Sequence, residues 1–415
     1  MNGAMTPYQR RLLVFLSVAT FFEGYDFLAL SQILPNLREA FHLSPSQGGL
    51  LVGVINAGTV LAWMVVRLAD RIGRRPVLAM TIAGYTITSL LSGLAPNIYV
   101  FAIMQLLARM FLLGEWAIAM VFAAEEYPAE RRGAVIGIIQ AFSAIGSITC
   151  AAVVPKLLHM NWGWRNVYFV GAVPLVIIAF ARRSIQETKR FAEARGDEAA
   201  AARPPADLMR IIRGPYRRRV FQLGAIWGLT YACTNVVVTF WKEFAVHERA
   251  FDDRAFGKAI ALASIVAIPL VLASGRMLDA IGRRRGAIVI YVLGGAGTYL
   301  AYTAQSRPLL TVGIIFAVFG ASGVLPVLNA FTTELFPTEL RADAYAWSNN
   351  LLGRIAYVLV PPIIGAAAET TGWGPAVSAT VIPLAVALVL ILVMMPETRG
   401  RELEETSRLG GETGE

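Results

Sequence analysis

Twelve apolar runs limit the possible folds of this 415-residue chain more than any other feature. Each is close to the ~20 residues that a helix needs to cross a bilayer. The runs predict helices at residues 11–34, 48–68, 77–94, 98–122, 134–158, 164–182, 219–245, 257–278, 286–304, 308–330, 344–368 and 374–394. Helices are expected throughout because they satisfy backbone hydrogen bonds without water. With 56% hydrophobic and 16% charged residues, the chain is too apolar for a soluble protein.

The positive charge of the chain indicates its orientation. Its net charge is +9, and Lys and Arg concentrate in alternate loops, above all in the segment 182–219. The positive-inside rule then places both termini in the cytoplasm and makes a nucleic-acid partner unnecessary. We expect a multi-pass protein of a bacterial inner membrane that functions as a monomer in the lipid bilayer.

An internal repeat relates the two halves of the chain. Matching residues lie 209 positions apart, as in Asp70 and Asp279, Arg74 and Arg283, Glu125 and Glu334, and Trp164 and Trp373. A parallel repeat of this kind predicts a pseudo-twofold axis along the membrane normal, with a substrate site between the halves. The predicted fold is therefore an all-α membrane protein with two six-helix bundles at 1–182 and 219–415. A cytoplasmic linker at 183–218 would join them.

Several motifs in the loops resemble those of the major facilitator superfamily over nearly the whole chain. GRMLDAIGRRR, from Gly275 to Arg285, fits the GxxxDxxGRR signature, and its first copy has Arg67 in place of the leading glycine. EEYPAERR, ELFPTELR and PETRG resemble loops of sugar-porter-like members. The resemblance implies a secondary transporter with twelve transmembrane helices.

The repeated charges of these loops are expected to form a cytoplasmic gate. Ion pairs such as Glu125 with Arg74, or Asp70 with Arg132 or Arg341, and their repeats would form when this side closes. The alternative is that the charges only set topology. The predicted gate residues are Asp70, Arg71, Arg74, Glu125, Arg132, Asp279, Arg283, Glu334 and Arg341.

Two acids in the first apolar run, FFEGYDFLAL, are unusual because a carboxylate inside a membrane is costly. EGYD resembles a segment of sugar and aromatic-acid proton symporters in which the Asp, here Asp26, belongs to the coupling machinery. Glu23 shares its helix face, and two close acids favour retention of a proton by one of them. Alternatively, one or both acids pair with an arginine and only anchor the helix.

Other charges are predicted near mid-membrane from the ~1.5 Å rise per helical residue. Arg109 is a candidate partner for Glu23 or Asp26, because an arginine stays charged at any working pH. Glu115 is either a second proton site or part of the gate.

Arg354 lies in NNLLGRIAYVLVPP, which resembles a segment of organic-ion and aromatic-acid transporters. A fixed positive charge there would bind a carboxylate through paired hydrogen bonds; the alternative is a structural ion pair. The other candidate substrate-binding residues are Tyr25, Gln140, Trp227, Tyr231, Asn235, Trp347 and Asn349. Their amides equally fit interhelical contacts, and their rings equally fit packing.

These patterns favour a proton-coupled symporter of a small organic solute, an organic or aromatic carboxylate, that works by alternating access. The expected partners are this substrate, protons and lipid. A proton-antiport exporter of drugs or metabolites is the first alternative, and a transport-inactive membrane receptor is the second. No catalytic triad, metal-ligand spacing or Walker-type motif indicates an enzyme, a metal site or a cofactor.

Overall fold

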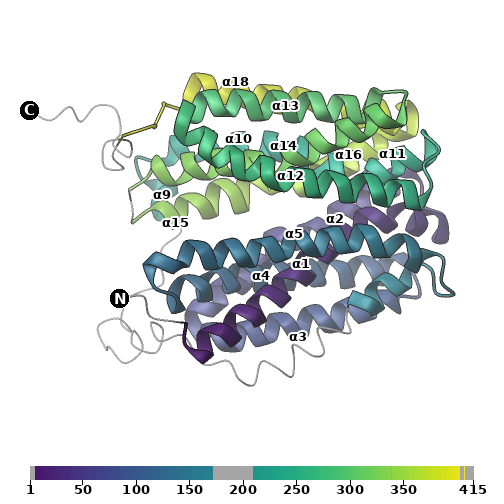
Figure 1. Cartoon of the computed structure of the whole chain (residues 1–415), viewed down its shortest axis with the longest axis horizontal. Helices are drawn as coiled ribbons and strands as arrows, with labels where there is room; N and C mark the ends of the chain where they lie inside the picture. The colour runs from purple at the N-terminus through teal and green to yellow at the C-terminus, as the bar shows by residue number, and fades with distance from the viewer. Residues whose placement is uncertain (1–4, 172–208, 338, 402–405, 407–415) are drawn as a thin grey trace, which may run out of the picture. The chain divides into compact units, whose positions relative to one another are not determined.

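The computed structural model describes residues 5–171, 209–337, 339–401 and 406, and this part of the chain contains helices but no strands (Figure 1). Eleven described helical stretches are long and apolar enough to cross a membrane. They match eleven of the twelve expected helices. The remaining one, expected at 164–182, lies outside the described residues from 172 onward, as does the expected linker up to residue 208.

The chain divides into two compact units. Unit 1 consists of Met1–His42 and Val54–Pro205, and unit 2 consists of Leu43–Gly53 and Ala206–Glu415. Unit 1 holds α1 (Pro7–Ala40), most of α2 (Pro45–Ile72), α3 (Arg74–Gly93), α4 (Ile98–Glu126) and α5 (Ala129–Leu158). Unit 2 holds α9 (Met209–Arg213), α10 (Arg217–Thr239), α11 (Trp241–His247), α12 (Asp253–Ile281), α13 (Arg283–Thr303), α14 (Arg307–Glu334), α15 (Arg341–Tyr345), the π-helix η2 (Ala346–Gly353), α16 (Ile355–Thr371), α17 (Trp373–Ser378) and α18 (Val381–Met394).

In unit 1, α1 lies along α5, and α3 lies along α4. The start of α1 is fixed by a capping box, in which Thr6 and Gln9 satisfy each other's backbone N–H groups. The core between the helices is apolar and includes the fully buried Leu16, Ile82 and Phe122. Polar side chains inside such a core are therefore exceptions that call for an explanation.

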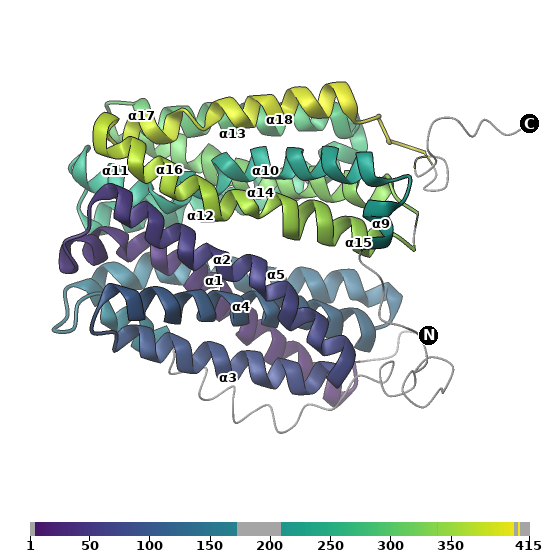
Figure 2. The same ribbon diagram turned by 180° about the vertical axis from the view of Figure 1, so that it is seen from behind.

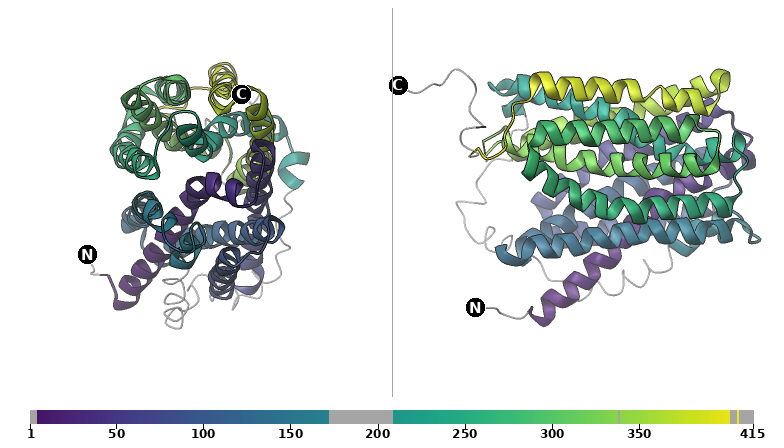
Figure 3. Two further views of the ribbon diagram at one scale, coloured as in Figure 1. Left: turned by 90° about the vertical axis from the view of Figure 1, so that its right-hand side faces the viewer. Right: turned by 45° about the horizontal axis from the view of Figure 1, so that its top comes forward.

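In unit 2, α12, α13 and α14 lie side by side (Figure 3). Gly294 and Gly320 bring the backbones of α13 and α14 into close contact. The yellow α18 packs against α10 and α13 (Figure 2). One expectation was wrong: the predicted helix at 219–245 is interrupted at Phe240, where α10 ends before α11 begins. The interruption allows the Trp241 indole to donate to the Ala301 carbonyl.

The expected helix at 344–368 is also irregular. Its first part is the π-helix η2, which ends with the Arg354 N–H donating to the Asn349 carbonyl at 3.0 Å. π-Helical turns inside membrane-spanning or soluble helices occur frequently at functional sites. The Arg354 side chain thus projects from a rare backbone geometry that is followed by the regular α16.

The first turns of α2 belong to unit 2 because they pack on α16. A Cβ added at Gly49 would lie 2.4 Å from the Pro361 carbonyl oxygen, and one at Gly365 would lie 2.5 Å from the Pro45 carbonyl oxygen. Only glycine permits this approach. The backbone N–H of Ser46 also donates to Glu369 at 3.1 Å.

The repeat is visible in the local backbone of both units. Gly73 and Gly282, which are 209 residues apart, precede α3 and α13 with φ of 105° and 98°. Such positive φ values favour glycine because it has no Cβ. The sequence repeat therefore corresponds to a repeated turn at the start of each of these helices.

Candidate functional site

A cluster of buried ionisable side chains lies inside unit 1, between α1, α3 and α4. Asp26 and Arg109 are each 5% exposed, and Glu115 is 4% exposed. Asp26 interacts with the Arg109 guanidinium and the Tyr85 hydroxyl. Arg109 is thus close enough to Asp26 to attract its charge, which offsets part of the cost of burying both charges.

Glu23 and Glu115 form a second part of the same cluster. Glu23 accepts a hydrogen bond from Ser143 of α5 at 2.7 Å. Glu115 is close enough to Glu23 for their charges to repel each other. Its Oε2 atom is buried and has no hydrogen-bond partner among the described residues. A carboxyl group in this setting is suited to exchange a proton, because two adjacent acids resist simultaneous ionisation.

Tyr85 and Ser143 were not among the predicted site residues. Ser143 follows no motif, and Tyr85 is one of many aromatic residues in the helices. Their roles depend on which helices become neighbours. The sequence held one usable signal for Ser143: it shares α5 with small residues that permit close packing.

Of the two predicted substrate-binding residues of unit 1, Tyr25 is close enough to Asp26 for an electrostatic interaction. Tyr25 is buried, and its hydroxyl donates to the Val167 carbonyl at 3.3 Å. Gln140 is exposed on α5. Their contacts with substrate stay predictions.

In unit 2, five of the predicted substrate-binding residues lie on α10 and η2. The Tyr231 hydroxyl donates to Asn349 Oδ1 at 2.9 Å. The Tyr231 ring packs against Trp227 with centroids 5.2 Å apart, and against Tyr357 at 4.8 Å. Trp347 is half-buried on η2. These contacts form an aromatic group that is held by a buried hydrogen bond.

Arg354 lies beside this aromatic group and interacts with Tyr231 and Tyr345. It is half-buried, and its Nε atom is buried without a hydrogen-bond partner among the described residues. Asn235, one turn beyond Tyr231 on α10, is 8% exposed and its Nδ2 atom likewise has no partner there. Buried donors without partners are rare, since each costs ~1–3 kcal/mol. Both are suited to an acceptor on a bound molecule.

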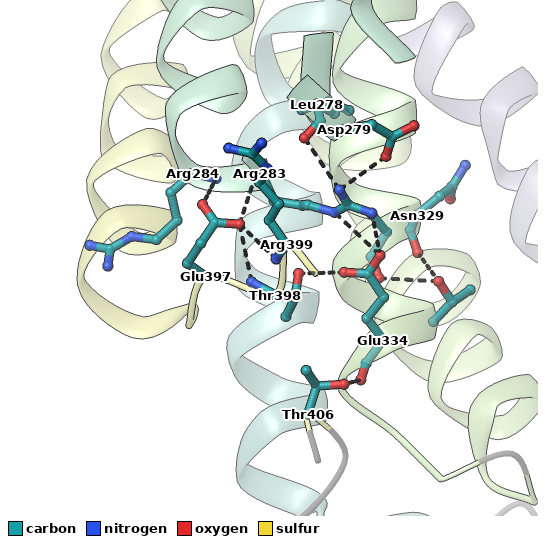
Figure 4. Close-up of polar contacts among 12 residues, drawn as sticks. Leu278, Asp279, Arg283, Arg284, Asn329, Glu334, Glu397, Thr398, Arg399 and Thr406 are labelled. Atoms are coloured by element: carbon teal, nitrogen blue, oxygen red, sulfur yellow. Dashed lines mark hydrogen bonds and ion pairs between the residues drawn. The ribbon is translucent and has the colours of Figure 1, made fainter. Parts of the chain in front are cut away.

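The loop motifs of unit 2 converge on Glu334, as Figure 4 shows. Arg283 binds Glu334 at 2.9 Å and Asp279 at 3.0 Å. Thr398, from the PETRG motif, also donates to Glu334. The neighbouring Glu397 accepts hydrogen bonds from the first backbone N–H groups of α13, an arrangement that favours a negative charge.

The equivalent contact in unit 1 is the expected pair of Arg74 and Glu125, at 3.4 Å. Arg71 is exposed in the last turn of α2, and the side chains of Asp70 and Arg132 lie outside the described residues.

The expected pairing of Asp279 with Arg341 is absent from the structure. Asp279 binds Arg283, one helical turn away, and Arg341 donates to the Phe336 carbonyl at 3.1 Å. The nearer partner satisfies Asp279 locally.

Comparisons with known proteins agree in family. The family model of the Major Facilitator Superfamily matches residues 16–245 and 228–412. The chain is 26% identical over 414 residues to a gallate transporter of Pseudomonas putida, covering 90% of this chain and 88% of the relative. It is 21% identical over 435 residues to a niacin transporter, NiaP, of Acinetobacter baylyi, covering 97% of both.

A solved structure also matches the fold. The inward open conformation of the xylose transporter XylE from E. coli superposes with a TM-score of 0.76 at 17% identity, covering 95% of this chain and 98% of XylE. Together with the family model, which spans almost the whole sequence, this fold places the chain in the Major Facilitator Superfamily, and the protein is a multi-pass membrane transporter.

Proposed function

We propose that this transporter is a proton-coupled symporter of small organic carboxylates that carry a planar ring. The proposal rests on two sets of polar side chains, one within each unit. Unit 1 holds the buried Asp26, Arg109 and Glu115 with the half-buried Glu23, and unit 2 buries donors without partners among the described residues beside an aromatic group. Ionisable groups inside a membrane protein are costly and mark ion or substrate pathways.

Unit 1 is proposed to carry the proton. When Asp26 is ionised, the permanently charged Arg109 neutralises it. When Asp26 takes up a proton, that attraction weakens and Arg109 becomes available to another anion. Glu23 and Glu115 provide a second carboxyl pair in which only one charge is readily accommodated. Protonation thus changes the charge of the cluster without removing any side chain from it.

Unit 2 is proposed to bind the substrate. A guanidinium binds a carboxylate through short, charge-assisted hydrogen bonds, and Arg354 has a buried Nε donor for one of them. The Tyr231 ring, which packs on the fully buried Trp227, would contact a flat substrate, and such ring contacts contribute ~0.5–1.5 kcal/mol beyond burial. Asn235 would donate to a further acceptor on the ring. The names of two relatives, a gallate and a niacin transporter, support the same chemistry.

The ion pairs at the helix ends are proposed to act as a gate. Arg74 with Glu125, and Arg283 with Glu334, would hold one conformation until substrate and proton are bound. Each pair contributes little, but several together bias a two-state equilibrium. The gate is proposed to face the cytoplasm, with both termini on that side of a bacterial inner membrane and the protein a monomer.

The test is a ligand screen on purified protein. Benzoate, a pyridine carboxylate and a hydroxybenzoate are compared with benzyl alcohol and xylose by thermal shift, and each hit is then followed in proteoliposomes with an inward pH gradient. The proposal predicts stabilisation by the carboxylates, accumulation driven by the gradient, and loss of both with Arg354→Gln. Stabilisation by benzyl alcohol equal to that by benzoate would contradict the assignment of a carboxylate.

A further inference from the structure

Among the described glycines of unit 1, Gly24 of α1 and Gly146 of α5 leave the least room for a side chain, and Gly24 directly follows Glu23. A Cβ added at Gly24 would lie 1.9 Å from the Ser143 carbonyl oxygen, and one added at Gly146 would lie 1.9 Å from the Phe21 carbonyl oxygen. Any side chain at either glycine would therefore force α1 and α5 apart. The spacing between these helices is fixed at the position of Glu23.

Two serines of α5 use this spacing differently. Ser147 Oγ donates to the Gly24 backbone carbonyl at 2.8 Å, so it ties the two helices together. Ser143 Oγ donates to Glu23 Oε2 at 2.7 Å, so it holds a side chain. The two residues lie one turn apart on the same helix, yet only one of them touches an acid proposed to carry a proton.

We propose that Ser143 is a positioning residue for proton coupling, which holds the Glu23 carboxyl group in place for exchange with Glu115. This inference rests on the proposed function, because it assigns a role within the same proton site. The close contact of α1 and α5 at Gly24 and Gly146 sets the distance between the Ser143 hydroxyl and the Glu23 carboxyl group. A serine hydroxyl is suited to this role because it rotates and serves both forms of the acid, as donor to the ionised one and as acceptor from the protonated one.

The length of the acid at position 23 is part of the inference. An aspartate on the same backbone is one methylene shorter, so its oxygen would retreat by roughly 1.5 Å and leave hydrogen-bond range of Ser143. Glu23→Asp and Ser143→Ala should therefore have the same effect, although one keeps the acid and the other removes its partner. If Ser143 had only a structural role, the two substitutions would not be expected to have the same effect.

The experiment compares two activities of the full-length protein in proteoliposomes, using the carboxylate that stabilises the wild type most. One is accumulation driven by a pH gradient, and the other is exchange of labelled for unlabelled substrate without a gradient. Ser143→Ala should lower accumulation about tenfold, the size of one charge-assisted hydrogen bond, and leave exchange within about twofold. Ser143→Thr keeps the hydroxyl and should retain accumulation. Ser147→Ala, the matched control, should leave the ratio of the two activities unchanged.

The outcomes separate this inference from the function on which it rests. If the wild type shows no gradient-driven accumulation, the proposed symport is wrong and this role for Ser143 falls with it. If the wild type accumulates substrate and Ser143→Ala does so equally well, or loses both activities in proportion, only the inference about Ser143 is wrong. Should Ser143→Ala fail to fold, Glu23→Asp makes the same comparison with the serine in place.

Discussion

Arg283 and Glu334 form an ion pair at 2.9 Å in unit 2, and the residues 209 positions earlier, Arg74 and Glu125, repeat it at 3.4 Å. The two pairs are equivalent in sequence but unequal in their surroundings. Glu334 also accepts from Thr398, whereas Glu125 Oε2 is buried without a partner among the described residues. The ion pair is therefore present in both units, and in unit 2 Thr398 of the PETRG motif adds a hydrogen bond to it.

This inequality predicts unequal effects of the same substitution. Glu334→Gln should lower the thermal stability of the purified protein more than Glu125→Gln, because charged hydrogen bonds contribute about 1.5–3 kcal/mol and Glu334 makes more of them. Melting curves of the two variants in the same detergent provide the comparison. Equal melting temperatures would show that the extra contacts of Glu334 carry no weight.

Glu397 predicts a dependence of stability on pH. Burial alone raises the pKa of this carboxyl group, but four backbone N–H donors outweigh burial and leave the pKa below its ordinary value. The donors belong to Arg283, Arg284, Arg399 and Thr398. A lowered pKa in the folded state adds stability above the unfolded pKa, and this stability is lost as pH falls through the folded value.

Glu397→Gln should therefore be less stable than the wild type at neutral pH, and the difference should shrink once the pH falls below the ordinary pKa of glutamate, about 4.3. Thermal melts of both proteins between neutral and acidic pH measure this difference. A gap that stays constant across the whole range would contradict the role of the ionised carboxylate.

The buried hydrogen bond between Tyr231 and Asn349 predicts that its removal lowers the stability of the protein. Tyr231→Phe keeps the ring contacts with Trp227 and Tyr357 but removes the 2.9 Å hydrogen bond, so it should destabilise the protein by about 1–2 kcal/mol. It should also weaken binding of the carboxylate identified by thermal shift, because η2 leads directly into Arg354. Tyr299→Phe, at a 57% exposed tyrosine, is the control and should change neither property.

The glycine contact between α2 and α16 predicts an effect on conformation. Gly365→Leu places a side chain where a Cβ already meets the Pro45 carbonyl at 2.5 Å, so the first turns of α2 cannot keep their place on α16. A cysteine introduced at Ser46 should then react faster with a maleimide in the purified protein. Ala366→Leu, at the neighbouring exposed position on α16, is the comparison variant. Equal labelling rates in the Gly365→Leu and unsubstituted backgrounds would contradict the prediction.

Several features were predictable from the sequence because they follow from local chemistry. Apolar runs of sufficient length predicted the eleven spanning helices that the structure describes. The 209-residue repeat predicted the ion pairs Arg74–Glu125 and Arg283–Glu334. An interaction of Arg109 with Glu23 or Asp26 was expected because all three are charges in apolar helices, and Arg109 lies close enough to Asp26 to attract its charge. In each case the signal lies in residue type and spacing.

Features that depend on helix neighbours were not predictable in this way. The hydrogen bond of Ser143 to Glu23 requires that α5 pack on α1 with a definite rotation, and an apolar pattern does not specify that rotation. The π-helix before Arg354 ends at Gly353, but a single glycine does not distinguish a π-helix from an α-helix, and the interruption at Phe240 has no adjacent glycine or proline. The expected distant partner of Asp279 is wrong because Arg283, one turn away at i+4, lies close enough to bind it first.

Simultaneous recording of substrate uptake and proton uptake in proteoliposomes, for the wild type and for Asp26→Asn, is the most direct test of proton coupling. The wild type should take up protons together with the carboxylate, and an inward pH gradient should drive accumulation of the carboxylate. Asp26→Asn, which mimics a permanently neutral acid beside Arg109, should lose both activities and retain exchange of labelled for unlabelled substrate. The role of Asp26 in proton coupling would be contradicted if Asp26→Asn still accumulated substrate in response to the pH gradient, with protons taken up at the wild-type ratio.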